Sequence, residues 1–141
     1  MQPNLLAKKI RENLLSQKEK LQKYLTVLET EETDIKSQDA DKLIKHIEAE
    51  KNIIEELNYF KRILDPLEAI YSNSPYKKDS AIAELKNGIK NLSTQVSIKS
   101  EKNKEVLDTV IKEIKLNLKN KQKLNVGVNS YKKVESRYVD I

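Results

Sequence analysis

Apolar residues recur at every third or fourth position along three long stretches that contain almost no glycine or proline. This spacing places them on one face of an α-helix and is typical of helices that pack against other helices. In the first stretch the positions are Ala7, Ile10, Leu14, Gln17, Leu21, Tyr24, Leu28, Glu31 and Ile35. The pattern resumes at Leu43, Ile47, Ile54, Leu57 and Leu64, and again at Ile82, Leu85, Ile89, Leu92 and Val96.

Polar residues between these stretches predict where three helices end, over about 4–36, 39–71 and 79–124. Asn4 and Asp39 are the expected N-caps, because their side-chain oxygens can accept hydrogen bonds from the first free backbone amides. The turn at 37–39 is short enough to fold the second helix back antiparallel. Pro66 is expected to kink or restart that helix. The predicted fold is all-α: a long antiparallel hairpin plus a third, longer helix, forming a three-helix coiled-coil-like bundle.

Residues 1–124 are expected to form a single helical domain, and residues 125–141 a flexible tail without helical periodicity. A chain of 141 residues fits one domain. Its hydrophobic content of 38% is low and its charged content of 35% is high, compared with the average soluble domain. These values favour a thin apolar seam between long helices over a thick core.

The third helix is longer than the other two, so part of it is expected to overhang, bend or pair with another molecule. Its apolar spacing is interrupted at Lys99 and Asn103 and then resumes. We predict that the second stripe is an exposed surface for a partner helix. It consists of Leu107, Val110, Ile111, Ile114 and Leu118. The alternative is that the far end of the second helix covers this stripe.

Charge is distributed unevenly, with a net of −2 over residues 1–70 and +7 over residues 71–141. A basic half can meet nucleic acid, anionic lipid or an acidic protein. Its excess cations in the third helix and tail are lysines, with Arg137 the one arginine among them. Nucleic-acid interfaces rely on arginine for bidentate contacts, so a solvated lysine face is the favoured interpretation and nucleic acid is not an expected partner.

Catalytic and metal-binding patterns are missing from the sequence. There is no cysteine and a single histidine, His46, and no glycine-rich phosphate loop or hydrolase motif occurs. We therefore expect no enzyme activity, no cofactor and no metal site. No apolar run approaches the roughly 18 residues of a transmembrane helix, and the first residues do not form a secretory signal. A cytoplasmic protein without stable membrane insertion is expected.

The passage from the first to the second helix combines a leucine-rich helix ending in glutamates, a short turn with Asp39, and an apolar series that ends at Lys61-Arg62. The second half adds Asn103 with the stripe after it, and a tail closing on residues 138–141. In this order, these features resemble the flagellar FlgN family of type III export chaperones. The family's usual glycine before the turn aspartate is Gln38 here, and the tyrosine–glycine pairing of its tail is absent.

This resemblance implies a chaperone that binds the C-terminal helical segment of hook–filament junction (hook-associated) proteins. It would prevent their premature self-association and deliver them to the flagellar export gate and its ATPase components. A helix-in-groove complex needs apolar anchors at such spacings, so we expect the stripe from Leu107 to Leu118 to bind the cargo. The resemblance implies that a tail tyrosine docks to the gate, with Tyr131 the best-placed counterpart and Tyr138 the second.

Two other classes of function remain open at the level of the sequence. One is a homodimeric coiled coil, a structural or adaptor protein whose third-helix stripe is buried against a second copy. The other is a basic helical protein that binds nucleic acid or an anionic membrane surface. Binding of the latter kind falls steeply with salt concentration, whereas a helix-in-groove contact is far less sensitive.

Overall fold

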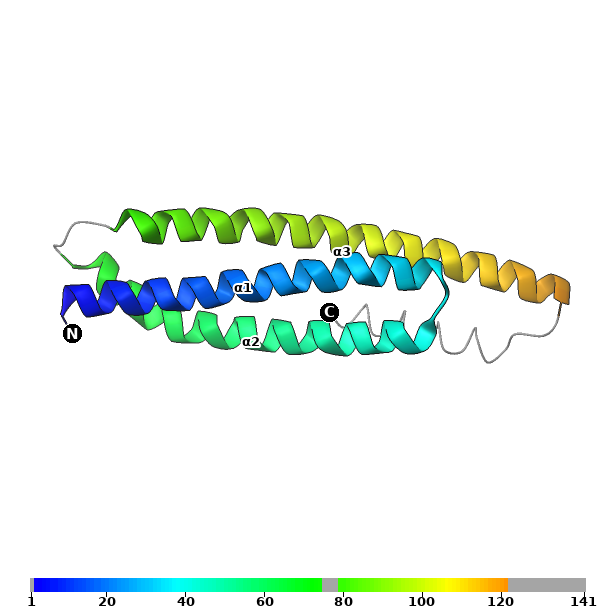
Figure 1. Ribbon diagram of the computed structural model, residues 1–141, viewed down its shortest axis with the longest axis horizontal. Coiled ribbons are helices and arrows are strands. Elements are labelled where there is room, and N and C mark those ends of the chain that lie inside the picture. Colours follow the sequence, from blue (N-terminus) through cyan, green and yellow to red (C-terminus); the bar gives the residue numbers. More distant parts are fainter. Residues whose placement is uncertain (1, 75–78, 122–141) are drawn as a thin grey trace.

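The computed structural model describes residues 2–74 and 79–121, and these residues form three α-helices and no strand. The helices are α1 (Pro3–Lys36), α2 (Ala40–Ser72) and α3 (Ser80–Lys121), of 34, 33 and 42 residues. Along the long axis of the molecule, α2 runs antiparallel to α1 and α3 runs parallel to it (Figure 1). The predicted all-α fold is confirmed. The expected tail, residues 125–141, lies outside the described residues.

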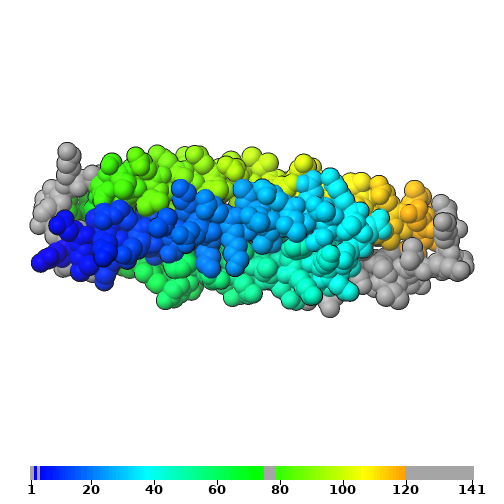
Figure 2. All heavy atoms as spheres, viewed as in Figure 1, coloured from blue at the N-terminus to red at the C-terminus, as the bar shows by residue number. Residues whose placement is uncertain are grey.

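Helix α1 lies between α2 and α3 along most of the molecule (Figure 1). It packs against both, whereas no Cα atom of α2 lies within 8 Å of a Cα atom of α3 in the described part of the chain. Side chains of all three helices nevertheless meet in shared apolar clusters. Figure 2 shows the resulting elongated body, with the last turns of α3 extending beyond the α1–α2 turn.

The turn between α1 and α2 is closed by backbone hydrogen bonds. The amide of Gln38 donates to the carbonyl of Ile35 at 3.0 Å, and the amide of Asp39 donates to the carbonyl of Asp34 at 3.1 Å. This pair of bonds is the Schellman arrangement, which normally has glycine at its left-handed position. Here Gln38 occupies that position with a φ of 60°, so the turn carries local backbone strain.

The helix starts follow the expected chemistry, with one exception. Asp39 caps α2, because its side chain accepts a hydrogen bond from the Lys42 amide at 3.1 Å. The prediction that Asn4 is the N-cap of α1 was wrong. The helix begins at Pro3, in its first turn, and Gln2 is the N-cap. Proline suits that position because it has no amide proton to leave unsatisfied.

Helix α2 continues through Pro66 and ends at Ser72, so of the two outcomes expected at this proline, a kink or a restart, the restart does not occur. Proline removes one backbone hydrogen bond from a helix interior. Pro66 is exposed, where water can bind the carbonyl that the missing amide leaves free.

The core consists of three apolar clusters along the bundle. The first joins the starts of α1 and α3 to the end of α2, through Leu6, Ile10, Leu14, Leu64 and Ile82. The central cluster contains Leu21, Tyr24, Leu28, Ile53, Leu57 and Val96. The last lies at the α1–α2 turn and contains Ile35, Leu43, Ile47, Leu107, Val110, Ile111 and Ile114. Nearly all predicted stripe positions of α1 are buried, including the polar Gln17 and Glu31.

Buried polar residues accompany the apolar clusters at two levels. Near the first, the Asn13 side-chain amide donates to the Phe60 carbonyl at 2.9 Å, and the Gln17 amide donates to Asn13 Oδ1 at 2.8 Å. Towards the α1–α2 turn lies a second group, which we call the polar layer: Glu31, Glu50 and Asn103, one from each helix, all at most 1% exposed. The helices are therefore aligned by polar contacts as well as by apolar packing.

Candidate functional site

The stripe predicted to bind cargo is part of the core. Leu107, Val110, Ile111 and Ile114 are only 2–7% exposed. They pack against Ile35 at the end of α1 and against Leu43 and Ile47 at the start of α2. The expectation that this stripe is exposed was wrong. The tight turn brings the end of α1 and the start of α2 together over α3, and the overhang of α3 begins only beyond them (Figure 1).

The predicted site also included Leu118 and two tail tyrosines. Leu118 is half-buried against the last apolar cluster, and nearby Leu116 is 61% exposed. The proposed gate-docking residues, Tyr131 and Tyr138, lie outside the described residues. Cargo binding by the stripe stays a prediction, but it would require the last cluster to open.

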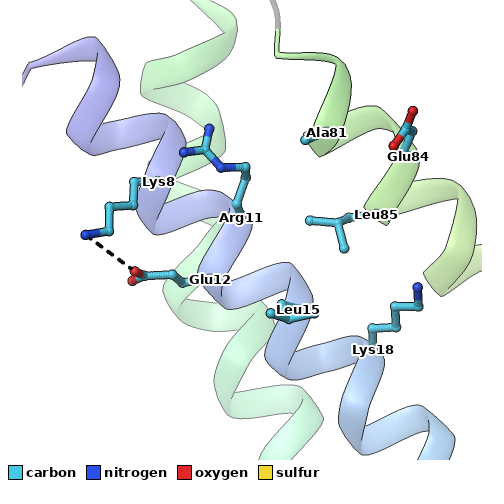
Figure 3. Close-up of a pocket in the computed structure, with 8 residues that line it drawn as sticks. All are labelled: Lys8, Arg11, Glu12, Leu15, Lys18, Ala81, Glu84 and Leu85. Carbon is cyan, nitrogen blue, oxygen red and sulfur yellow. Dashed lines mark ion pairs between the residues drawn. The ribbon is translucent and has the colours of Figure 1, made fainter.

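An open groove lies instead between the first halves of α1 and α3, which we call the α1–α3 groove (Figure 3). Its volume is about 570 Å³. It is lined by Lys8, Arg11, Glu12, Leu15 and Lys18 from α1 and by Ala81, Glu84 and Leu85 from α3. Because α1 and α3 run parallel, residues about 70 apart in the sequence face each other across it.

The floor of this groove is apolar. Leu15 is 48% exposed although it is a large aliphatic residue, and it lies opposite Leu85 across the groove (Figure 3). Leu85 is half-buried and packs on the first apolar cluster. An exposed leucine alone is ordinary, but two leucines that line one groove beside polar residues form a surface of the kind that binds a partner's apolar side chains.

Charged side chains surround the floor, and most of them are paired. Lys8 and Glu12 form an exposed ion pair at 4.0 Å, and Arg11 contacts the carboxylate of Asp79 at the start of α3. A backbone hydrogen bond from Ala81 and the contact with Arg11 lower the pKa of Asp79. Figure 3 shows the Glu84 carboxylate pointing away from α1, so the charges that face the groove are nearly balanced apart from Lys18.

The polar layer is the most unusual electrostatic feature of the described chain. The Asn103 side-chain amide donates to the Leu28 carbonyl at 2.8 Å and to Glu31 Oε1 at 3.0 Å. Glu50 is hydrogen-bonded to Glu31, and burial together with the nearby Glu31 carboxylate raises the pKa of Glu50 to about 9. Burial and these two carboxyl groups also raise the pKa of Tyr24. At neutral pH Glu50 is therefore in its protonated form.

The residues that the structure describes contain no group of three or more potential metal ligands. None of the described helices is long and apolar enough to cross a membrane. His46, which the sequence placed beside the apolar face of the second helix, contacts Asp34 through Nε2 at 2.5 Å.

A second exposed apolar row lies on the C-terminal half of α2. Tyr59, Ile63 and Ile70 are 40–55% exposed, and helical spacing places them away from the core residues Leu57 and Leu64. Neither this row nor the α1–α3 groove was predicted. Two features of the sequence could have indicated these surfaces. Leu15, Ile63 and Ile70 are apolar but fall outside the core stripes, and Gly88 stands within a helix.

Comparison with known proteins gives one distant similarity. The chain is 25% identical over 111 residues to an uncharacterized protein of Treponema pallidum (strain Nichols), a match that covers 79% of this chain and 71% of that protein. No protein-family model and no solved structure matches the chain.

Proposed function

We propose that the protein is a flagellar type III export chaperone of the FlgN kind, which binds the C-terminal helical segment of a hook–filament junction protein. The observation that carries this proposal is the α1–α3 groove, an open apolar floor with charged surroundings on an all-helical body. An amphipathic helix can bury its apolar face by lying in such a groove. The order of sequence features that resembles the family supports the same function.

In this proposal the protein acts by binding and performs no covalent chemistry, so it needs no cofactor or metal. Leu15 and Leu85 contact the apolar face of the cargo helix, which is the face through which cargo molecules would otherwise self-associate. Each large aliphatic side chain that is fully buried in such a contact contributes roughly 1.5–3 kcal/mol. The complex is reversible, as delivery requires.

The cargo helix is assigned to the groove and not to the predicted stripe for an energetic reason. A helix bound along Leu107–Ile114 would have to displace Ile35, Leu43 and Ile47, each of them fully buried. Exposing three such side chains costs roughly 1.5–3 kcal/mol apiece before any new contact forms. The groove is open already and requires no displacement.

Delivery involves a second contact, with the export gate and its ATPase components in the cytoplasm. We assign this contact to the tail, with Tyr131 first and Tyr138 second. Truncation after Leu124 is expected to leave cargo affinity unchanged and to stop secretion of the cargo, as measured in culture medium. Loss of cargo binding upon truncation would contradict this division of roles.

The test of cargo binding is isothermal titration calorimetry of the full chain with C-terminal segments of hook–filament junction proteins. We expect saturable binding, and at least about tenfold weaker binding after Leu15→Glu, because a carboxylate replaces an apolar anchor. The matched control is Ile98→Glu, on α3 outside the groove lining, where Ile98 is 65% exposed. The control should bind like the wild type.

Absence of binding to every such segment would refute the chaperone proposal, and equal effects of the two variants would refute the groove as its site. Light scattering of the same samples addresses the coiled-coil alternative. A stable dimer that shows no cargo binding would favour that alternative.

A further inference from the structure

Gly88 lies inside the first half of α3, and inside a helix glycine is less favourable than alanine by about 1 kcal/mol. No described glycine has a positive φ, so the backbone does not demand glycine here. A Cβ atom added to Gly88 would meet only the end of the Lys18 side chain, with Cε and Nζ both at 3.6 Å. This is ordinary van der Waals contact, so the fold of the chain alone gives no reason for glycine at this position.

Of the three cations that line the groove, Lys18 is the one without an ion pair to another described residue. The other two cations are occupied, Lys8 with Glu12 and Arg11 with Asp79, whereas no carboxylate pairs with Lys18 among the described residues. Its ammonium group points towards α3, over Gly88 (Figure 3). An unpaired cation beside an apolar floor is suited to a carboxylate on a partner.

Gly88 and Lys18 thus mark the same end of the groove from two different helices. We propose that the α1–α3 groove receives an acidic amphipathic helix of a partner protein, whose leucine-like side chains contact Leu15 and Leu85 and whose carboxylate pairs with Lys18. When Lys18 turns to this carboxylate it uncovers Gly88, where the partner's backbone approaches α3 closely and a larger side chain would hold it away. This inference rests on the proposed function and adds the chemistry of the partner.

Charge complementarity decides the kind of occupant. A polyanion such as nucleic acid relies on clusters of free cations, whereas Lys8 and Arg11 of this lining are already paired with carboxylates. A single helix needs only an apolar row and one well-placed carboxylate. Leu15 and Lys18 lie three residues apart on α1, so a partner with a carboxylate one turn from an apolar residue matches them.

The test uses two synthetic helical peptides of about 15 residues with leucines at every third or fourth position. One peptide carries glutamates beside the leucines, and its twin carries lysines at the same positions. Fluorescence anisotropy with the full chain should show the acidic peptide binding about five- to tenfold more tightly than its twin. Lys18→Glu should reverse this preference. Equal affinities, no saturable binding of either peptide, or no effect of Lys18→Glu would each overturn the proposal.

Substitutions at Gly88 give an independent test, for which its neighbour Asn87 serves as the control. Gly88→Leu should weaken the acidic peptide at least about tenfold, because its side chain blocks close approach, while Asn87→Leu at the adjacent exposed position should not. Gly88→Ala should raise the Tm of the free protein, because alanine favours the helix. A fall in Tm would mean that the fold itself needs glycine, and unchanged peptide binding by Gly88→Leu would remove the site from this part of the groove.

The outcomes separate this inference from the proposed function. Junction-protein segments could bind the wild type and the Lys18→Glu and Gly88→Leu variants equally well. This result would uphold the proposed chaperone function and overturn the proposed chemistry of the groove. Acidic peptides that bind as expected, without binding of any junction-protein segment, would uphold the groove and refute the chaperone.

Discussion

Replacing Glu50 with glutamine tests how the polar layer sets the stability of the bundle. Glu50 is 1% exposed, and burial and the adjacent Glu31 carboxylate raise its pKa from 4.5 to about 9. Other charged or titratable groups that face it are Tyr24 on α1, whose pKa these carboxyl groups raise, and Lys104 on α3, which partly opposes the shift. Glutamine has the same shape as the protonated acid and can donate the same hydrogen bond to Glu31.

The direction of the pH effect follows from the two states. Glu50 has a higher pKa in the folded protein than in the unfolded chain, so the folded state binds more protons between about pH 4.5 and pH 9. Its contribution to stability is therefore complete below pH 4.5 and is lost as the pH rises towards 9. The loss is about 1.4 kcal/mol per pH unit, which amounts to roughly 3 kcal/mol at pH 7.

Urea unfolding followed by far-UV circular dichroism, repeated between about pH 5 and pH 8, measures this slope. We expect the free energy of unfolding of the wild type to fall as the pH rises over this range. Glu50→Gln should be close to the wild type at the acidic end and more stable at pH 8. The matched control is Glu55→Gln, an exposed position of the same helix, which should keep the wild-type slope. If Glu50→Gln left the dependence of the unfolding free energy on pH unchanged, the raised pKa of Glu50 would be refuted.

Three further predictions concern the core and the turn. The double substitution Ile111→Glu with Ile114→Glu should unfold the protein, because both residues are at most 6% exposed and buried carboxylates are costly. Loss of the helical circular dichroism signal would show this unfolding. A folded variant would mean that the stripe is a surface. Leu28→Ala should lower the free energy of unfolding by about 2–5 kcal/mol, and Leu116→Ala, at a position that is 61% exposed, by less than about 0.5 kcal/mol. Gln38→Gly should raise the Tm, because it relieves a φ of 60°, and a lower Tm would show that unfolded-state entropy dominates.

Much of the fold could be predicted from the sequence because helix periodicity is a local property. The α1 stripe includes Gln17 and Glu31 at apolar-face positions, and both are buried. Asp39 was identified as a cap from its type and place alone. The FlgN family, which the sequence resembles, usually has glycine where this chain has Gln38. In the structure Gln38 takes the left-handed conformation that glycine favours.

The predictions about the candidate site were wrong where burial depends on how far one helix is displaced along its axis relative to another. Helix lengths indicated that α3 overhangs, but they do not say which of its residues lie beyond the α1–α2 turn. The stripe from Leu107 to Ile114 lies inside the covered part. The groove was missed for the same reason, because Leu15 and Leu85 meet only when α1 and α3 are parallel and correctly aligned.

The polar layer supplies this alignment. Asn103 on α3 donates hydrogen bonds to both the Leu28 carbonyl and Glu31 on α1, so a shift of α3 by one heptad, about 10.5 Å, would remove these bonds. Each buried polar group left unsatisfied costs about 1–3 kcal/mol, whereas apolar contacts at heptad spacing re-form after such a shift. Hence the polar layer favours one offset, and that offset places Lys18 over Gly88 at the opposite half of the bundle. Asn103→Leu should therefore loosen the alignment on which the groove depends, and acidic-peptide binding should weaken even though position 103 lies outside the groove lining.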